Sequence, residues 1–197
     1  MIRLSNGHTF EYMAASGALG FDGLGWPWER PLLWTGLLDP SVFTTVIKTL
    51  TFEPREGNLR WYNPLGCIRF LPGGTLNAVG LTNPGIDWWC REIGPTVNSA
   101  KRPLVGSILG EVWDLVRMAK MLNEFDLVGL EINASCPNTK EDILTNTSKV
   151  IESCEIVRKI SRFPIILKLS VVHDVKAIVP KVEGIVEALA INSVPCS

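Results

Sequence analysis

The sequence is organised around one stretch, Leu127-Val-Gly-Leu-Glu-Ile-Asn-Ala-Ser-Cys-Pro-Asn138. It begins as a short apolar run with β-branched residues, which is typical of a strand buried on both faces. Pro137 prevents further ladder bonding because it lacks an N–H. The stretch ends in polar side chains, which are Asn133, Ser135, Cys136 and Asn138. A buried strand that delivers amides and a thiol at its C-terminal end predicts one edge of an active site.

The totals are those of one globular domain over residues 1–197, with 46% hydrophobic and 20% charged residues. The net charge of -1 argues against broad electrostatic binding of nucleic acid or of an anionic membrane. No apolar run reaches the roughly 18 to 20 residues that a membrane-spanning helix needs. Residues 1–30 also lack the apolar core of a signal peptide. We therefore expect neither nucleic acid nor a membrane as a partner.

The cysteine pattern predicts neither a metal site nor a disulfide framework. The number of cysteines is odd, no Cys-x-x-Cys pair occurs, and His8 and His173 are far apart in sequence. This pattern indicates a reduced, cytoplasmic protein. The five cysteines are Cys67, Cys90, Cys136, Cys154 and Cys196.

Strand patterns alternate with helical ones along the chain. After a strand that runs into a small-residue turn at residues 12–17, we expect strands at 43–50, 103–108, 127–133, 165–169 and 188–192. Helical spacing occurs at 86–93, 111–123, 148–161 and 175–182. A hairpin-type turn is expected at Asn6-Gly7, and residues 17–39 are expected to be irregular and packed by their own aromatics. The alternation predicts parallel βαβ units.

Polar residues recur where these strands end, and this recurrence favours one α/β architecture over another. In a (β/α)₈ barrel the C-terminal strand ends form the active-site face. We therefore prefer a TIM-barrel type with six of the eight strands present over a doubly wound sheet. The strand-end residues are Ser16, Lys48, Ser107, Asn133 with Cys136, Lys168, and Asn192.

Each candidate has a functional and a plain structural interpretation. Cys136 is either a base, if its surroundings favour the thiolate, or a small buried residue. Lys48 and Lys168 either form a positively charged pocket or extend to water from strand ends. The asparagines fit recognition of a planar ring with alternating carbonyl and N–H groups, or capping of turns, as for Asn83 before Pro84.

Three motifs in order resemble the signatures of dihydroorotate dehydrogenases. They are Lys48-Thr-Leu-Thr-Phe-Glu-Pro-Arg-Glu-Gly-Asn58, Leu76-Asn-Ala-Val-Gly-Leu-Thr-Asn-Pro-Gly85 and Asn133-Ala-Ser-Cys-Pro-Asn138. Ala15-Ser-Gly17, Lys168 and Asn192-Ser193 follow the matching order. A cysteine in the 133–138 loop is similar to the soluble class 1 enzymes, since the membrane-associated class uses serine as its base.

The resemblance implies an FMN-dependent barrel that oxidises dihydroorotate to orotate in pyrimidine biosynthesis. It implies that Cys136 removes the C5 proton while hydride passes from C6 to the flavin, with Lys48 as a further catalytic residue. Implied substrate contacts are Lys48, Asn77, Val79, Gly80, Leu81, Asn133, Asn138, Asn192 and Ser193. Implied flavin contacts are Ala15, Ser16, Gly17, Lys48, Thr49, Ser107, Asn133, Lys168 and Ile191.

The chain departs from the family pattern at several places. Ser107 stands where many class 1 members have asparagine, Ala134 where leucine is usual, and Thr139-Lys-Glu-Asp142 where a glycine-rich loop is common. After the sixth expected strand, the glycine-rich turns that hold a flavin phosphate in a barrel are absent from this sequence. We therefore expect weak FMN binding by the isolated chain, two open sheet edges and an exposed apolar interior.

Two alternatives to the enzyme stay open at the level of sequence. One is a non-catalytic remnant or interaction module that cannot hold FMN, and the other is a dihydropyrimidine dehydrogenase-type flavin domain, which shares the Asn-x-Ser-Cys-Pro pattern. The electron acceptor is equally open between fumarate, NAD through a partner subunit, and others. Dimers are common in class 1, so a homodimer is a further expectation.

Overall fold

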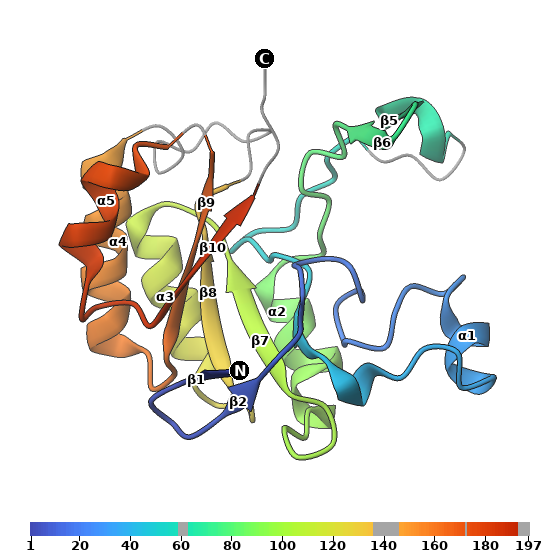
Figure 1. Cartoon of the computed structure of the whole chain (residues 1–197), viewed down its shortest axis with the longest axis horizontal. Helices are drawn as coiled ribbons and strands as arrows, with labels where there is room; N and C mark the ends of the chain where they lie inside the picture. Colours follow the sequence, from blue (N-terminus) through green and yellow to red (C-terminus); the bar gives the residue numbers. More distant parts are fainter. Residues whose placement is uncertain (59–62, 136–145, 172, 193–197) are drawn as a thin grey trace.

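The computed structural model describes residues 1–58, 63–135, 146–171 and 173–192, and its centre is one parallel sheet (Figure 1). Six strands form this sheet in the order β10-β9-β8-β7-β4-β3, and every neighbouring pair is parallel. The strands are β3 (Met13–Ala14), β4 (Thr44–Val46), β7 (Leu104–Ile108), β8 (Gly129–Asn133), β9 (Ile165–Ser170) and β10 (Ala188–Asn192). All six strands expected from the sequence are therefore present.

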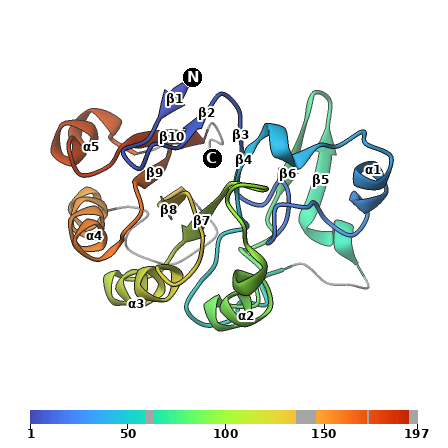
Figure 2. The same ribbon diagram turned by 90° about the horizontal axis from the view of Figure 1, so that it is seen from below.

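The helices lie along one side of the curved sheet, as the view from below shows (Figure 2). They are α2 (Ile86–Glu92), α3 (Val112–Leu122), α4 (Thr147–Ile160) and α5 (Val175–Val182). Side chains cap two of them, since Asn146 accepts from the Ser148 N–H at 3.0 Å and Asp174 from the Ala177 N–H at 3.0 Å. The expected helices are confirmed to within one or two residues.

This arrangement is a half barrel with flanking helices, so the expected (β/α)₈-type fold with six strands is confirmed. The two edge strands are β3 and β10, as expected for an open sheet. Because all strands run in the same direction, their C-terminal ends share one edge, where polar side chains were predicted to gather.

The core divides into two clusters, one on each face of the sheet. The larger cluster lies between sheet and helices and includes fully buried Trp89 and Leu130. The smaller one lies on the inner face and consists of Val46, Val105, Val128 and Ile166. These four side chains are at most 7% exposed, so the expectation of an exposed apolar interior is wrong at these positions.

An N-terminal hairpin lies at the base of the sheet, beside the N-terminal ends of its strands (Figure 1). Its strands β1 (Ile2–Arg3) and β2 (Thr9–Phe10) pair antiparallel around the expected Asn6-Gly7 turn. The Asn6 side chain donates to the Val128 carbonyl at 3.0 Å, and the Ser5 N–H donates to the Glu187 carboxylate at 2.6 Å. These contacts hold the hairpin against the strands that it covers.

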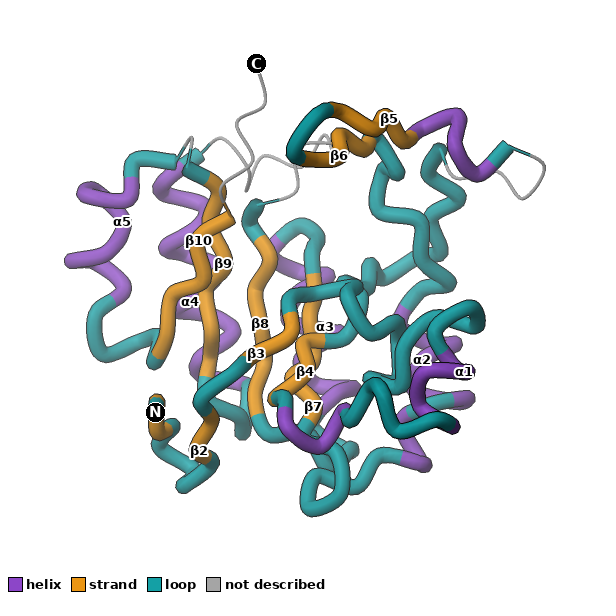
Figure 3. The backbone as a smooth tube through the Cα atoms, turned by 45° about the vertical axis from the view of Figure 1, so that its right-hand side comes forward, coloured by secondary structure: helices purple, strands orange, loops and turns teal. Residues whose placement is uncertain are grey.

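A second hairpin, β5 (Ile68–Leu71) with β6 (Gly74–Asn77), was not predicted from the sequence. It stands apart from the sheet (Figure 3), and Phe70 and Leu76 on it are exposed. The glycines and prolines between residues 59 and 85 concealed it, because Pro72-Gly73 forms its turn and does not interrupt its strands.

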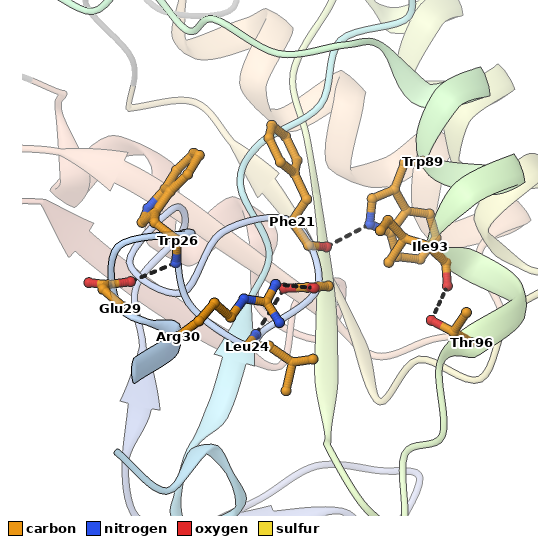
Figure 4. A network of polar contacts seen from close by, with 9 residues as sticks. Phe21, Leu24, Trp26, Glu29, Arg30, Trp89, Ile93 and Thr96 are labelled. Atoms are coloured by element: carbon orange, nitrogen blue, oxygen red, sulfur yellow. Dashed lines mark hydrogen bonds and ion pairs between the residues drawn. The ribbon is translucent and has the colours of Figure 1, made fainter. Parts of the chain in front are cut away.

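Residues 17–39 are mostly irregular, with one short helix, α1 (Arg30–Trp34). The rings of Trp26 and Trp28 stack with centroids 5.4 Å apart. The Trp89 indole donates to the Phe21 carbonyl at 2.8 Å (Figure 4). The aromatics therefore pack this segment in part. Trp34 does not take part in this packing, since it is 82% exposed.

Within the described part of the chain, helices long and apolar enough to cross a bilayer are lacking.

We predict that Leu130→Ala lowers the free energy of unfolding by about 2 to 5 kcal/mol, because it empties a fully buried site on the central strand β8. Leu189→Ala on the edge strand β10 is the matched control and should cost much less, since Leu189 is 38% exposed. Urea denaturation of both variants measures the difference. Equal losses would contradict the assignment of the core to the helix side of the central strands.

Candidate functional site

The polar strand-end residues lie on the inner face of the sheet in successive rows. Strand pairing sets Ser107 beside Glu131, Asn133 beside Lys168, and Ser170 beside Asn192. Directly paired residues point to the same face. Glu131 is also paired with Ile166, a member of the inner-face cluster, so this face is the barrel interior.

One irregularity in β4 brings the β3 loop to the site. The strand expected at 43–50 ends at Val46, and Leu50 rejoins the sheet through a bridge to Ile108. Between these points the Lys48 N–H donates to the Gly20 carbonyl at 2.8 Å, and the Thr49 N–H donates to Ser16 Oγ at 3.0 Å. The backbone N–H groups of Lys48 and Thr49 therefore bond the segment after β3 and not a neighbouring strand.

Hydroxyl groups from β7 and from the segments after β3 and β4 form a continuous chain across this edge. Ser16 Oγ lies 2.7 Å from Thr49 Oγ1, which lies 2.9 Å from Ser107 Oγ. Ser107 Oγ donates to Glu131 Oε1 at 2.7 Å, and Asn133 Nδ2 donates to Thr49 Oγ1 at 2.7 Å. Four of the residues predicted for the site are thus joined by direct hydrogen bonds.

Gly17 packs closely against Lys48, a second contact between the β3 loop and the end of β4. Gly17 has φ of +85°, and a Cβ on it would lie 3.3 Å from Lys48 Cδ. A larger residue at position 17 would be strained by its backbone conformation and would displace the lysine stem. The two predicted residues Gly17 and Lys48 are therefore neighbours.

Glu131 belongs to the site but was not predicted. It is 2% exposed, in the middle of β8. Burial raises the pKa of its carboxyl, while the positive charge of Lys168 and the Ser107 hydrogen bond act in the opposite direction. The signal that could have found it is a carboxylate inside an apolar run, because such a group is rarely buried without a specific partner.

The 77–83 loop is held to the chain after β4 by Asn83. Asn83 Oδ1 accepts from the Thr51 N–H at 3.1 Å and from the Gly85 N–H at 3.0 Å, which is the turn-capping role expected for it. Gly80 and Leu81 have φ of +73° and +57°. Asn77 is exposed and pairs with Ile68 on the β5–β6 hairpin, and within the described part of the chain no hydrogen bond joins it to the inner-face residues.

Three predicted residues, Cys136, Asn138 and Ser193, lie outside the described residues. Asn192 is half-buried beside Ser170, whereas Ala15 is exposed. The side chain of Ile191 is 55% exposed and pairs with Leu169 on the helix side of the sheet. A ligand on the inner face would therefore reach Ile191 through its backbone.

A cavity of about 310 Å³ lies elsewhere, and none of its lining residues belongs to the inner-face site. Its walls come from segments that precede β4 and β7, at the opposite end of the strands. This cavity therefore does not mark the candidate site, which is located by side-chain chemistry at the strand C-termini. The lining residues are Leu24, Asp39, Pro40, Ser41, Thr96, Asn98, Lys101 and Arg102.

Comparison with known proteins gives concordant results. A family model described as dihydroorotate dehydrogenase matches residues 34–194. The catalytic subunit of dihydroorotate dehydrogenase B (NAD(+)) from Desulforudis audaxviator is 37% identical over 68% of this chain and 44% of its own length. The corresponding subunit from Geobacillus kaustophilus is 34% identical over 87% of this chain and 52% of its own length. The chain thus spans about half the length of these curated relatives.

A solved structure, 2,3-dimethylmalate lyase of the PEP mutase/isocitrate lyase superfamily, superposes with a TM-score of 0.50. The match covers 92% of this chain and 56% of that one, at 13% sequence identity. A likeness at this identity indicates a shared fold and nothing about the reaction.

We predict a pH-dependent stability difference between the protein and its Glu131→Gln variant. A carboxyl whose pKa is raised on folding binds its proton more tightly in the folded state, so its ionisation destabilises the fold. The stability of the native protein relative to Glu131→Gln should therefore fall as the pH rises above the ordinary value of 4.5, until the folded-state pKa is passed.

Urea denaturation at a series of pH values measures this difference, with Glu131→Gln compared at each pH. The exposed Glu124→Gln is the control for the loss of a carboxyl outside the site. A difference that rises with pH would show that Lys168 and Ser107 outweigh burial at Glu131.

Proposed function

The chain belongs to the dihydroorotate dehydrogenase family, and on that premise we propose that its inner-face site oxidises dihydroorotate to orotate with FMN as cofactor. The observation that carries the proposal is the connected set of Ser16, Thr49, Ser107 and Asn133 at the strand C-termini, with Lys168 paired beside Asn133. In a barrel enzyme this edge is where ligands bind and react.

The residues present fit a flat, electron-rich ring. Because Gly17 has no side chain, its backbone lies close to the aliphatic part of Lys48. A side chain at position 17 would fill the space beside this lysine. Lys168 and Lys48 supply positive charge, and Asn133 supplies an amide at the same edge. Ser16, Gly17, Thr49, Ser107, Asn133 and Lys168 are therefore proposed to hold the isoalloxazine, together with backbone at Ala15 and Ile191.

FMN, when bound, supplies a hydride acceptor. The chain supplies the proton acceptor: we assign this role to the Cys136 thiolate, which takes the C5 proton as the C6 hydride leaves and a C=C bond forms. Lys48 stabilises the substrate through its positive charge. Lys48, Asn77, Val79, Gly80, Leu81, Asn133, Asn138, Asn192 and Ser193 are the proposed substrate contacts.

The names of the relatives favour NAD(+) as the final electron acceptor. They are catalytic subunits of NAD(+) enzymes, so a partner subunit that passes electrons to NAD(+) is favoured over fumarate. The described thiols of Cys90 and Cys154 form no disulfide, which supports the proposal of a reduced, cytoplasmic setting. A homodimer stays a prediction.

We predict that FMN binds the protein and that Asn133→Ala weakens binding about tenfold, the effect of one lost hydrogen bond. Quenching of flavin fluorescence, titrated into the millimolar range to capture weak binding, measures both affinities. Asn123→Ala is the matched control, because Asn123 bonds the Ile160 carbonyl on the helix side of the sheet. Absence of FMN binding by the native protein would favour the non-catalytic module.

We predict that Cys136→Ala lowers the rate of flavin reduction by dihydroorotate about 10²- to 10⁴-fold at neutral pH, the usual contribution of a general base. Anaerobic bleaching of the flavin absorbance follows the reaction. Cys90→Ala is the control, since burial raises the pKa of Cys90 to about 11 and keeps that thiol protonated. An unchanged rate in Cys136→Ala would rule out this base.

The same assay separates the proposed substrate from that of a dihydropyrimidine dehydrogenase-type domain. Dihydroorotate carries a carboxylate that the lysines can meet, whereas dihydrouracil does not. Faster flavin reduction by dihydrouracil would favour that alternative.

A further inference from the structure

Glu131 is a buried carboxylate to which the proposed reaction gives no task. It lies one row below Asn133 on the inner face, 2% exposed, and it takes a hydrogen bond from Ser107 at 2.7 Å. An ionisable group in such a place is costly to bury and is often kept for a specific interaction. Its connections lead toward the ligand edge of the site.

The hydrogen-bond chain from Glu131 has a fixed direction. The Ser107 hydroxyl has a single hydrogen, and it donates that hydrogen to Glu131 Oε1. Ser107 Oγ can then only accept from Thr49 Oγ1, which lies 2.9 Å away. The hydrogen of Thr49 is used in this bond, so Thr49 Oγ1 can only accept from Asn133 and Ser16. The single hydrogen of Ser16 is then shared between Thr49 Oγ1 at 2.7 Å and the Ile47 carbonyl at 2.9 Å.

This direction determines how the Asn133 amide is turned. Only Nδ2 can face Thr49 Oγ1, at 2.7 Å, because Thr49 has no hydrogen left for an oxygen. Oδ1 then points to Ser135, from which it accepts both the N–H at 3.1 Å and the hydroxyl at 2.8 Å. The Thr49 contact of Nδ2 and the Ser135 contacts of Oδ1 therefore require the same orientation of the amide, independently of each other.

The capacity that Asn133 has left is a single donor. An asparagine amide has two N–H donors and an oxygen that accepts two hydrogen bonds. Ser135 fills the oxygen and Thr49 takes one donor, and the second Nδ2 hydrogen has no acceptor among the residues that the structure describes. The amide therefore offers a ligand an N–H and no oxygen.

We propose that Glu131 is a positioning residue. It is the terminal acceptor of a chain of hydrogen bonds that Asn133 donates to Thr49, Thr49 to Ser107, and Ser107 to Glu131. This chain holds the Asn133 amide so that only an N–H faces a ligand. The ligand atom that this N–H meets is an acceptor, such as a ring carbonyl oxygen or an unprotonated ring nitrogen. This reading of the ligand rests on the proposed function, whereas the orientation of the amide does not.

A different role for Glu131 would be to balance the charge of Lys168. The two roles respond differently to substitution. Glu131→Gln removes the charge but keeps an oxygen that can accept from Ser107, whereas Glu131→Met removes both. Ser107→Ala keeps both charges and breaks the chain.

The side-chain NH₂ signals of Asn133 in ¹⁵N–¹H spectra of the ligand-free protein test the proposal, with Asn133→Ala identifying them. We expect Glu131→Met and Ser107→Ala to shift these signals and Glu131→Gln to preserve them. Thr45→Val is the control and should leave them unchanged, because the buried Thr45 hydroxyl has no partner among the described residues. In a Thr49→Val background, Glu131→Met should add nothing further.

Two results would overturn the proposal: Glu131→Gln behaving like Glu131→Met, which assigns the effect to charge, or Asn133 signals that are the same in all variants. If Glu131→Met fails to fold, Ser107→Ala carries the same test. Titration with FMN is the second arm, in which Ser107→Ala should bind about tenfold more weakly than Thr45→Val. Asn133 shifts without FMN binding in the native protein would uphold the chain and reject the proposed function.

Discussion

The structure depends on the parallel register of β8 between β7 and β9. That register pairs Ser107 with Glu131 and Asn133 with Lys168, and it thereby assembles polar groups from three strands on one face. A shift of one residue would turn Glu131 toward the helices and Ile132 toward the interior. The apolar helix side prevents such a shift, since Leu130 and Ile132 are fully buried there.

The inner face changes in character along the strands. Near the N-terminal ends, Val46 and Val105 are paired and belong to an apolar cluster that lies near the β1–β2 hairpin. One row further, Glu131 lies between Ser107 and Ile166, and the next row holds Asn133 and Lys168. The apolar rows give the sheet a dry base, and this low-polarity surrounding strengthens the hydrogen bonds of the rows above it.

The sequence predicted the strands and helices well because their hydrophobic periodicity is strong and local. For Ser16, Thr49, Ser107, Asn133 and Lys168 it also predicted a place at the C-terminal edge, because the ends of parallel strands meet there. The β5–β6 hairpin was missed because its exposed strands carry no buried pattern. The early end of β4 was missed because it depends on Lys48 and Thr49 amides that bond the distant segment 16–20.

Glu131 shows why a site cannot be derived from residue types alone. The sequence argument selects polar side chains at the C-terminal ends of the strands, which form the rim of the site. Glu131 lies one row below this rim, inside an apolar run, and was therefore not selected. Its role follows from counting hydrogens: each hydroxyl in the chain has one, so a single acceptor at the bottom fixes every donor above it. The orientation of an amide at the rim is thus decided by a buried group with which it makes no contact, and the rim and the interior have to be considered as one unit.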